Sequence, residues 1–347
     1  MLIAPEMLRF LGAGLSRPEC VLAHRSGAVF TADWTASGGV AILHPDGSVR
    51  RILARDPSRP LRPNGIAFEP SGTMLVAHLG AEEGGIFRLS HDGTVEPVLT
   101  ELAGRPLPPT NYVHRDPAGR LWISISTTKS PRHLAYRRDV ADGFIVCFED
   151  GKARVACEEL GYANECLLAP DGAHLYVNET FARRLSRFAL GANGGLGPRE
   201  TVTEFGHGTF PDGLTFASDG SVWVTSIVSN RLIRVGSDGN QSTILADADE
   251  EHVARVEQAF QSARMGRPHL DTMRSRQLRN ISSLAFGGPS LTTAYLGCLL
   301  GQSVAVFDSP IAGFRPAHYD FPLTDILSLL PPASPEGNTA RPHDGQE

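Results

Sequence analysis

Apolar segments of five to seven residues alternate with turns that contain glycine along most of the 347-residue chain. The clearest example is the stretch 210–226, FPDGLTFASDGSVWVTS, in which an Asp-Gly turn joins two segments rich in β-forming residues. The segments AVFTADW, LWISIS and HLYVNET have the same character. Short apolar runs bounded by turn residues are typical of strands, so the pattern predicts an all-β chain built from hairpins.

The spacing of this hairpin recurs along the chain. A polar or acidic residue precedes a turn glycine by eight positions at five places, and a weaker sixth copy begins at Ser282. Consecutive copies lie 45, 47, 53, 48 and 70 residues apart. A period of this size is typical of propeller blades, so the sequence predicts a six-bladed β-propeller with four-stranded blades. The five repeated residues, called the anchors below, are Glu19, Asn64, Asn111, Asn164 and Asp212.

One domain over residues 1–330 accommodates the six units, because closed all-β folds often exceed the average domain size. Residues 1–18 form an entry segment that is expected to supply a strand and close the ring. The polar, proline-rich tail 331–347 is predicted to be disordered.

The longest interval between repeats carries a helical pattern. Within 248–265, Val253, Val256, Phe260 and Ala263 follow helical spacing, and acids occupy the first turn. A second helical piece is predicted over 269–278. We therefore expect a helical insertion at about 248–280, between blades five and six, acting as a lid, a partner surface or a cover for a blade edge. The basic stretch 127–143 is expected either to wall a pocket or to form a disordered surface loop.

Composition narrows the function classes. The formal charge is −6 and no basic stripe occurs, which argues against nucleic-acid binding. No window approaches the ~20 apolar residues of a membrane span. The five cysteines are odd in number and lack a close pairing motif, so free thiols are expected. These features predict a cytoplasmic monomer or small homo-oligomer that acts on a small molecule.

The anchors are placed at the start of each innermost strand, so they should face the propeller axis. Glu19, Asn111, Asn164 and Asp212 would offer only oxygen atoms, which hard cations prefer. One divalent cation is predicted, calcium first, with magnesium, manganese or zinc as alternatives. In the competing interpretation these side chains hydrogen-bond their own strand starts. Substrate contacts are assigned to Asn64, Asn111 and His78.

Several units together resemble a known family. They are RPECV with ADW, PTNYVHRDPAGRLWISIS, YANECLLAPDGAHLYVNET, FPDGLTFASDGSVWVTS and SSLAFGGPSLTTAYLG, and they cover most of residues 17–310. This order of motifs is similar to the senescence marker protein/gluconolactonase family, which includes regucalcin. The resemblance implies a six-bladed propeller that hydrolyses lactones with one catalytic divalent ion in its channel.

The resemblance also implies roles for single residues. The family's metal-binding Glu, Asn and Asp fall on Glu19, Asn164 and Asp212. Its blade-three Asn, which contacts substrate in some members and the metal in related diisopropyl fluorophosphatases, falls on Asn111. The chain departs from the family pattern where it has Cys20, Pro109 and Glu165. The acidic residue that the family pattern places beyond the second strand of blade three is also not evident near Lys129. Pro109 replaces an Arg found in members that act on sugar lactones.

The sequence therefore predicts a metal-dependent hydrolase, a lactonase in the first instance, with Asp212 as metal ligand and general base. An esterase or phosphoesterase at the same ion is the alternative within enzymes. A non-catalytic calcium-binding or scaffold propeller is the alternative outside them. A condensing propeller similar to strictosidine synthase is disfavoured by the metal-ligand character of the anchors.

Overall fold

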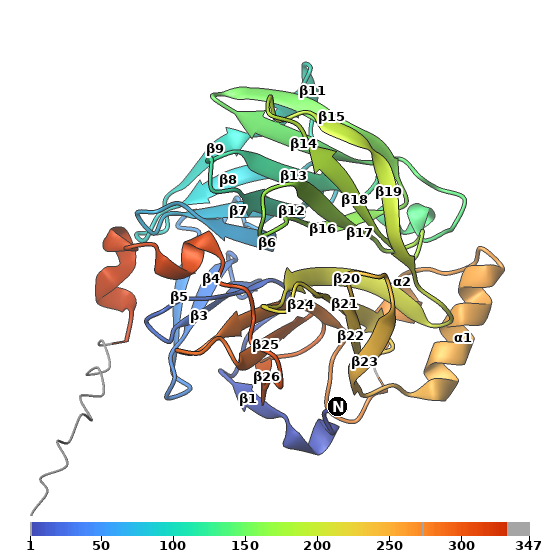
Figure 1. Ribbon diagram of the computed structural model, residues 1–347. Helices are drawn as coiled ribbons and strands as arrows, with labels where there is room; N and C mark the ends of the chain where they lie inside the picture. Colours follow the sequence, from blue (N-terminus) through green and yellow to red (C-terminus); the bar gives the residue numbers. More distant parts are fainter. Residues whose placement is uncertain (1, 273, 332–347) are drawn as a thin grey trace, which may run out of the picture.

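The computed structural model describes residues 2–272 and 274–331, which form six four-stranded antiparallel sheets arranged as a ring (Figure 1). The predicted six-bladed β-propeller is confirmed. In blades one to five the strands follow one another in sequence, with the first strand innermost. The channel along the axis is therefore lined by one strand from each blade.

The first three blades have the following strands. Blade one contains β2 (Val21–Ala23), β3 (Val29–Asp33), β4 (Gly39–Leu43) and β5 (Val49–Leu53). Blade two contains β6 (Pro63–Phe68), β7 (Met74–His78), β8 (Gly85–Leu89) and β9 (Val95–Leu99). Blade three contains β12 (Thr110–Arg115), β13 (Leu121–Ile125), β14 (Gly143–Glu149) and β15 (Lys152–Leu160), preceded by the small hairpin of β10 (Glu101–Leu102) and β11 (Arg105–Pro106).

The last three blades complete the ring. Blade four contains β16 (Ala163–Leu168), β17 (His174–Glu179), β18 (Arg184–Leu190) and β19 (Leu196–Glu204). Blade five contains β20 (Thr209–Phe216), β21 (Val222–Val228), β22 (Arg231–Val235) and β23 (Gln241–Ala246). Blade six contains β24 (Ile281–Gly287), β25 (Thr293–Cys298) and β26 (Val304–Asp308), and its outermost strand is β1 (Arg9–Leu11).

The two ends of the chain meet in blade six. Strand β1 pairs antiparallel with β26, with Arg9 opposite Val306 and Leu11 opposite Val304. The entry segment thus supplies the strand expected of it. Before β1, Pro5–Met7 forms a short 3-10 helix (η1).

The innermost strands are irregular where the anchors lie. In β6 the paired residues are Pro63 and Ile66, so Asn64 falls in a register shift between them. Equivalent shifts enclose Asn111, Asn164, Asp212 and, in blade six, Ser282. A β-bulge of this kind bends the strand and redirects a side chain. A bulge therefore recurs at four of the five anchors, Asn64, Asn111, Asn164 and Asp212.

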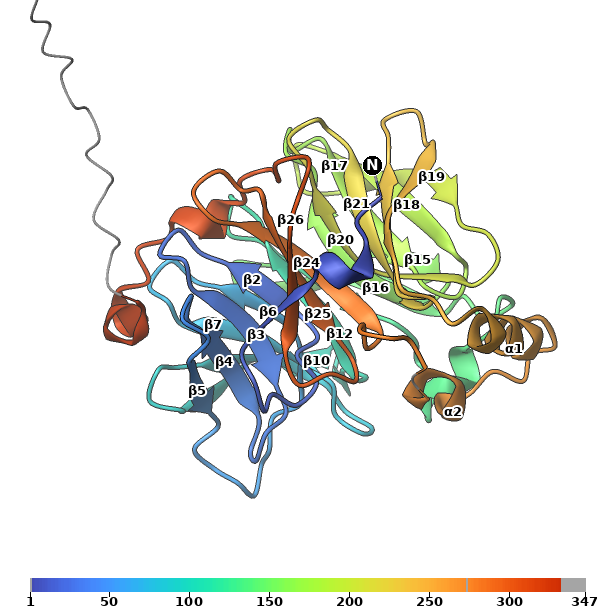
Figure 2. The same cartoon turned by 90° about the horizontal axis from the view of Figure 1, so that it is seen from below.

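The helical insertion packs on the ring at blades four and five. Helix α1 (Glu250–Gln261) begins at the N-cap Asp249, whose carboxylate accepts the backbone N–H of His252 at 2.8 Å. Its buried face, Val253, Val256 and Phe260, joins an apolar cluster with residues of the blades. Figures 1 and 2 show α1 and α2 together on one side of the ring.

The second helix of the insertion differs from its predicted bounds. Helix α2 covers Arg267–Asp271, not 269–278. Pro268 lies in its first turn, and the chain is extended again at Thr272. Further on, the carboxylate of Asp247 accepts the backbone N–H groups of Gln277 (2.7 Å) and Leu278 (2.8 Å). These bonds to a side chain replace the helical bonds that the sequence pattern suggested.

A buried ion pair attaches α1 to blade four. The Glu257 carboxylate accepts hydrogen bonds from both terminal nitrogens of Arg183, one of them at 3.0 Å. It also accepts the backbone N–H of Gly208 at 2.9 Å. The Arg183 guanidinium lies 4.2 Å from the centre of the Phe260 ring. The insertion is therefore integrated into the blade surface through charge and apolar contacts together.

Glu257→Ala should destabilise the fold by about 3–5 kcal/mol, because it leaves the Arg183 guanidinium buried without its counter-charge. Urea unfolding measures the change in the free energy of unfolding. Glu200→Ala, which removes an exposed ion pair with Arg187 at 2.9 Å, is the control and should cost less than about 1 kcal/mol. Equal losses in both variants would contradict the assignment of a buried, fixed pair.

The C-terminal segment covers the side of the ring opposite the insertion. It contains two 3-10 helices, η3 (Ala317–Asp320) and η4 (Thr324–Leu329), drawn in red in Figures 1 and 2. Leu323 and Ile326 are fully buried in the cluster that includes blades one and two. The tail predicted to be disordered lies, apart from Pro331, outside the described residues. Within the described part of the chain, none of the helices combines the length and apolar character that crossing a bilayer requires.

Candidate active site

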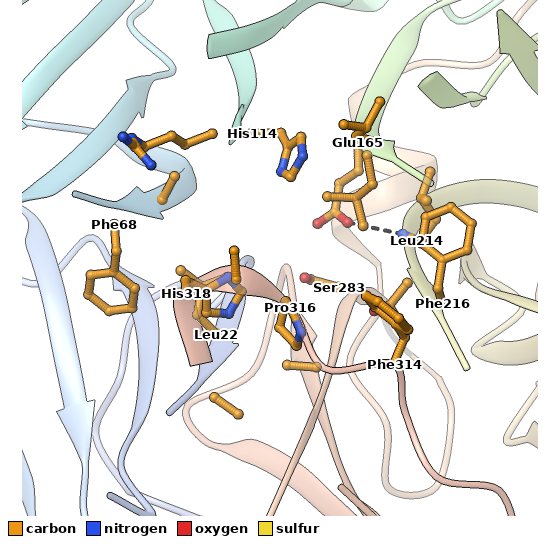
Figure 3. A pocket seen from close by; sticks show the side chains of 18 of the residues that line it. Leu22, Phe68, His114, Glu165, Leu214, Phe216, Ser283, Phe314, Pro316 and His318 are labelled. Carbon is orange, nitrogen blue, oxygen red and sulfur yellow. Dashed lines mark hydrogen bonds between the residues drawn. The ribbon is translucent and has the colours of Figure 1, made fainter. Parts of the chain in front are cut away.

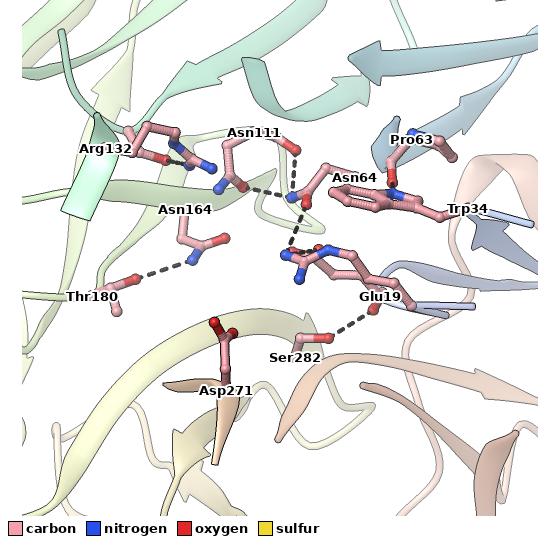
Figure 4. Close-up of polar contacts among 12 residues, drawn as sticks. Glu19, Trp34, Pro63, Asn64, Asn111, Arg132, Asn164, Thr180, Asp271 and Ser282 are labelled. Atoms are coloured by element: carbon pink, nitrogen blue, oxygen red, sulfur yellow. Dashed lines mark hydrogen bonds and ion pairs between the residues drawn. The ribbon is translucent and has the colours of Figure 1, made fainter. Parts of the chain in front are cut away.

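All five anchors line one small cavity on the propeller axis, of about 40 Å³. Each comes from the innermost strand of a different blade or from the residues just before it, and each is buried. Figure 4 shows Glu19, Asn64, Asn111 and Asn164 around this space. The structure thus brings together the four residues predicted to bind the cation, with Asn64 beside them.

An arginine that the sequence prediction did not include accompanies Glu19. The Nη2 atom of Arg17 lies 2.8 Å from Oε2 of Glu19 and 3.5 Å from Oδ1 of Asn64. Its guanidinium also lies 4.9 Å from the ring centre of Trp34. Glu19 Oε2 is buried and, apart from this ion pair, has no hydrogen-bond partner of good geometry among the described residues. The charge of Glu19 is therefore balanced by Arg17, while its Oε2 atom still lacks a well-formed hydrogen bond.

Two of the three amide side chains, those of Asn64 and Asn164, are held by hydrogen bonds through their nitrogen atoms, and Asn111 accepts from Asn64. Asn64 donates to the backbone oxygen (3.0 Å) and to Oδ1 (3.3 Å) of Asn111. Asn164 donates to Oγ1 of Thr180 at 3.1 Å, and Thr180 donates to the backbone oxygen of Pro211 at 2.8 Å. Because the nitrogen of Asn164 is engaged in this way, its amide oxygen is directed to the cavity. The competing interpretation, in which the anchors bond only their own strands, does not describe these contacts between blades.

Asp212 is the second carboxylate of the cavity. Burial, followed by the charges of Glu19 and Glu165, raises its pKa well above the usual range of a carboxyl. The amide of Asn178 donates to the backbone oxygens of Asp212 (3.1 Å) and Gly213 (3.0 Å), which fixes the bulge that carries it. A side chain at Gly213 would collide with the backbone of Ser282, so the strand can approach blade six only with glycine here.

The donor set fits a hard divalent cation. Two carboxylates, Glu19 and Asp212, would balance its charge, and the oxygens of Asn111 and Asn164 would complete the set. The buried, incompletely bonded Oε2 of Glu19 is the kind of atom that a cation would satisfy. The described chain contains no cluster of three or more His, Cys, Asp or Glu side chains arranged for a metal, so the amides are required.

His78 is not among the residues that line the cavity. Its Nδ1 atom accepts the backbone N–H of Arg62 at 3.0 Å, and its ring packs edge-on against Phe87 at 5.6 Å. Burial lowers its pKa. Asn64 and Asn111 line the cavity and His78 does not, so a substrate contact by His78 stays a prediction that the contacts of its ring do not support.

Two segments outside the blades form the remaining walls. The stretch 127–143 is ordered: it contains the 3-10 helix η2 (Arg132–Ala135), and Asp142 accepts the hydroxyls of Thr127 (2.6 Å) and Thr128 (2.7 Å) at its base. It contributes Arg132 and Tyr136 to the cavity. The insertion contributes Arg267 and Leu270 from α2. The stretch 127–143 thus walls the cavity, one of the two roles predicted for it, and the insertion contributes to the same wall.

A second, mainly apolar cavity of about 170 Å³ lies further along the innermost strands (Figure 3). It is lined by residues that follow the anchors in sequence and by 314–321 of the C-terminal segment. Glu165, which replaces the family's glycine, points into it, and its carboxyl accepts the N–H of Leu214 at 3.0 Å. Burial raises the pKa of Glu165 to about 8. Glu165 thus lines a different cavity from the anchors, although its charge acts on Asp212.

Glu165→Gln should flatten the dependence of stability on pH. Because the folded-state pKa of Glu165 is raised from 4.5 to about 8, its contribution to stability is fully present below the unfolded pKa and is lost as the pH rises through about 8. Unfolding midpoints in urea, measured at about pH 5 and pH 8.5, should therefore differ less in the variant than in the wild type. The exposed Glu149→Gln is the control. Identical pH slopes in wild type and Glu165→Gln would contradict the burial of an ionisable Glu165.

Comparison with known proteins identifies relatives in sequence. Residues 17–254 match the family described as SMP-30/Gluconolactonase/LRE-like region. A 6-deoxy-6-sulfogluconolactonase of Pseudomonas putida is 31% identical over 127 residues, which are 36% of this chain and 41% of that protein. A pentonolactonase of Haloferax volcanii is 25% identical over 188 residues, which are 54% of this chain and 52% of that protein. The matches thus span about half or less of these relatives.

Solved structures show the same fold. A gluconolactonase from Xanthomonas campestris superimposes with a TM-score of 0.64 at 17% identity, covering 87% of this chain and 89% of that one. The calcium-binding protein regucalcin from Agrobacterium tumefaciens gives 0.63 at 18% identity, covering 89% and 97%. The family match extends over more than half of the chain, and so the chain belongs to the SMP-30/gluconolactonase/LRE-like family, whose members include lactonases.

Proposed function

We propose that the protein is a lactonase that depends on one divalent cation, calcium first, held by Glu19, Asn111, Asn164 and Asp212. The observation that carries the proposal is the convergence of these four oxygen donors from four blades on one buried cavity. Membership of a family that includes named lactonases supports the reaction type. Regucalcin, a structural neighbour described as calcium-binding, supports the choice of cation.

The chain's own groups have distinct roles in this proposal. A divalent cation bound here supplies Lewis-acid activation of the lactone carbonyl and of a water molecule. Asp212 accepts the proton of the attacking water as the water oxygen adds to the carbonyl carbon. The proton then passes to the ring oxygen when the carbon–oxygen bond breaks, which yields the hydroxy acid. The position of Asp212 among the four oxygen donors supports this assignment, because its carboxylate would lie beside a water molecule bound to the same cation.

Other groups bind and orient. Asn64 and Asn111 are hydrogen-bonded to each other and present amide groups to the substrate side of the cavity. Arg17 holds the Glu19 carboxylate in place through its ion pair. Tyr136, from the ordered loop after β13, covers the cavity and limits the entry of water.

The test is a hydrolysis screen of purified protein with added calcium, magnesium, manganese or zinc. Aldonolactones, aliphatic lactones, aryl esters and phosphoesters are offered in parallel, and ring opening is followed by proton release. Metal-dependent turnover of lactones above that of esters supports the proposal. Preferred turnover of aryl esters or phosphoesters would replace the lactonase by the corresponding esterase, and binding of calcium without any turnover would point to a calcium-binding propeller.

A further inference from the structure

The cavity of the anchors carries more positive than negative side chains. Three arginines, Arg17, Arg132 and Arg267, line it together with the carboxylates of Glu19 and Asp212. Asp271, the ion partner of Arg267, adds a third carboxylate beside these groups. With a divalent cation bound, three arginines and the doubly charged cation would face three carboxylates, which leaves an excess of two positive charges. Arg17 is committed to Glu19 at 2.8 Å. The other two come from the loop and the insertion that wall the cavity, and their contacts decide what they can bind.

Arg132 is a cation without a counter-ion. Its Nη2 atom donates to the hydroxyl of Ser126 at 3.0 Å, and its guanidinium lies 5.4 Å from the ring centre of Tyr162. Its Nε atom is buried without a hydrogen-bond partner, and the one side-chain hydrogen bond that Arg132 makes within the described chain goes to the neutral hydroxyl of Ser126. A buried donor without an acceptor is costly, so this one is suited to an acceptor brought by a ligand.

Arg267 lies on α2 and lines the cavity together with Arg132 of η2. Its ion partner, Asp271, is on the same helix at 2.8 Å, and the two side chains are 49% and 43% exposed. An exposed pair of this kind contributes little to stability, so the guanidinium can exchange Asp271 for another anion at small cost. Arg132 and Arg267 thus offer one unsatisfied and one exchangeable guanidinium at the wall of the same small cavity.

We propose that the substrate of this lactonase carries an oxyanion group remote from its lactone ring, and that Arg132 and Arg267 bind that group. Guanidinium groups match carboxylate, sulfonate and phosphate oxygens with paired hydrogen bonds. The inference rests on the proposed lactonase function. It explains why uncompensated positive charge lies beside a site whose cation already balances its two acids.

Matched substrates test the proposal. An aldonolactone with a neutral hydroxymethyl terminus is compared with the same lactone bearing a terminal carboxylate, sulfonate or phosphate. The wild type should show a kcat/KM at least about 10-fold higher for one of the anionic lactones, mainly through a lower KM. Which of the three is preferred identifies the oxyanion. Raised salt should reduce this preference, since part of it is electrostatic.

Arg132→Gln provides the decisive comparison. It should lower kcat/KM for the anionic lactone about 10- to 100-fold and change it less than about 3-fold for the neutral one. Arg267→Gln should act in the same direction with a smaller effect. Arg138→Gln, an exposed arginine of the same loop that does not line the cavity, is the matched control and should behave as wild type. Equal losses on neutral and anionic lactones would assign Arg132 a structural role and overturn the proposal.

The outcomes separate this inference from the proposed function. A wild type that hydrolyses neutral lactones as well as anionic ones remains a lactonase, and the oxyanion subsite is overturned. If no lactone is hydrolysed, calorimetry of sulfate binding to the metal-loaded wild type and to Arg132→Gln still decides the subsite. Binding that Arg132→Gln weakens at least about 10-fold supports an oxyanion subsite in a protein of another function, and binding that is equal or absent in both overturns it.

Discussion

Asp212→Asn is expected to keep the fold and some of the cation but to lose hydrolysis by about 10²- to 10⁴-fold, the range typical of removing a general base. Asn has nearly the shape of Asp and retains one oxygen ligand, whereas it cannot accept a proton from water. The backbone bonds from Asn178 at 3.1 and 3.0 Å do not involve the Asp212 side chain, so the bulge should persist. The measurement is kcat at saturating cation, with circular dichroism to verify folding.

The cation concentration must be saturating. Otherwise a lower kcat caused by weaker cation binding would be mistaken for the loss of the general base. Asp171→Asn is the matched control: Asp171 is an exposed turn residue of blade four whose Oδ1 accepts the N–H of Ala173 at 2.9 Å, a bond that Asn can also accept. It should leave kcat unchanged. Near-normal turnover of Asp212→Asn at saturating cation would remove Asp212 as the base and leave it only as a ligand.

Removal of the cation should abolish turnover, and turnover should return when the cation is replaced. Exhaustive chelation leaves the Glu19 and Asp212 carboxylates facing one buried cavity, where only Glu19 of the two is paired directly with an arginine, Arg17, among the described residues. Metal analysis is expected to give about one divalent ion per chain before chelation. Calcium, magnesium, manganese and zinc are then added back separately, and the ion that restores the highest kcat is identified as the catalytic one.

Glu19→Gln distinguishes a ligand from a base in the same experiment. Removing one of two ligand charges should weaken cation affinity by at least about 10-fold, while excess cation should restore much of the activity. Glu69→Gln, which affects a partly exposed pair with Arg88 in blade two, is the control. Full turnover by protein shown to contain no bound metal would contradict metal dependence altogether.

The repeat explains why much of the site was predictable from sequence. Each of the first five blades places an anchor eight residues before its turn glycine, so residues as distant as Glu19 and Asp212 occupy equivalent positions around one axis. A polar residue at a fixed place in a repeated hairpin is therefore located in three dimensions as soon as the fold is known. The roles of these residues, unlike their positions, still depend on experiment.

The parts that were missed depend on contacts that no repeat encodes. Arg17 has a counterpart in blade two, Arg62, two residues before Asn64, yet only Arg17 of the two lines the cavity. The link before Glu19, with Arg17 at a φ of 53°, places the Arg17 guanidinium against the Glu19 carboxylate. His78 lies on the correct strand, yet its ring is held by Arg62 and Phe87. The predicted second helix failed because Asp247, thirty residues earlier in the chain, takes the N–H of Gln277.

The pairing of β1 with β26 has a consequence for synthesis of the chain. Leu11 leaves the ribosome early, whereas its partner Val304 follows almost 300 residues later. At the ~5–20 residues per second of translation, β1 waits roughly 15 to 60 s for the strand that completes it. Blades one to five, each contiguous in sequence, can form during that interval, and blade six cannot. A nascent chain arrested before Val304 should therefore have an open ring, with the segment Arg9–Leu11 accessible to proteases until translation resumes.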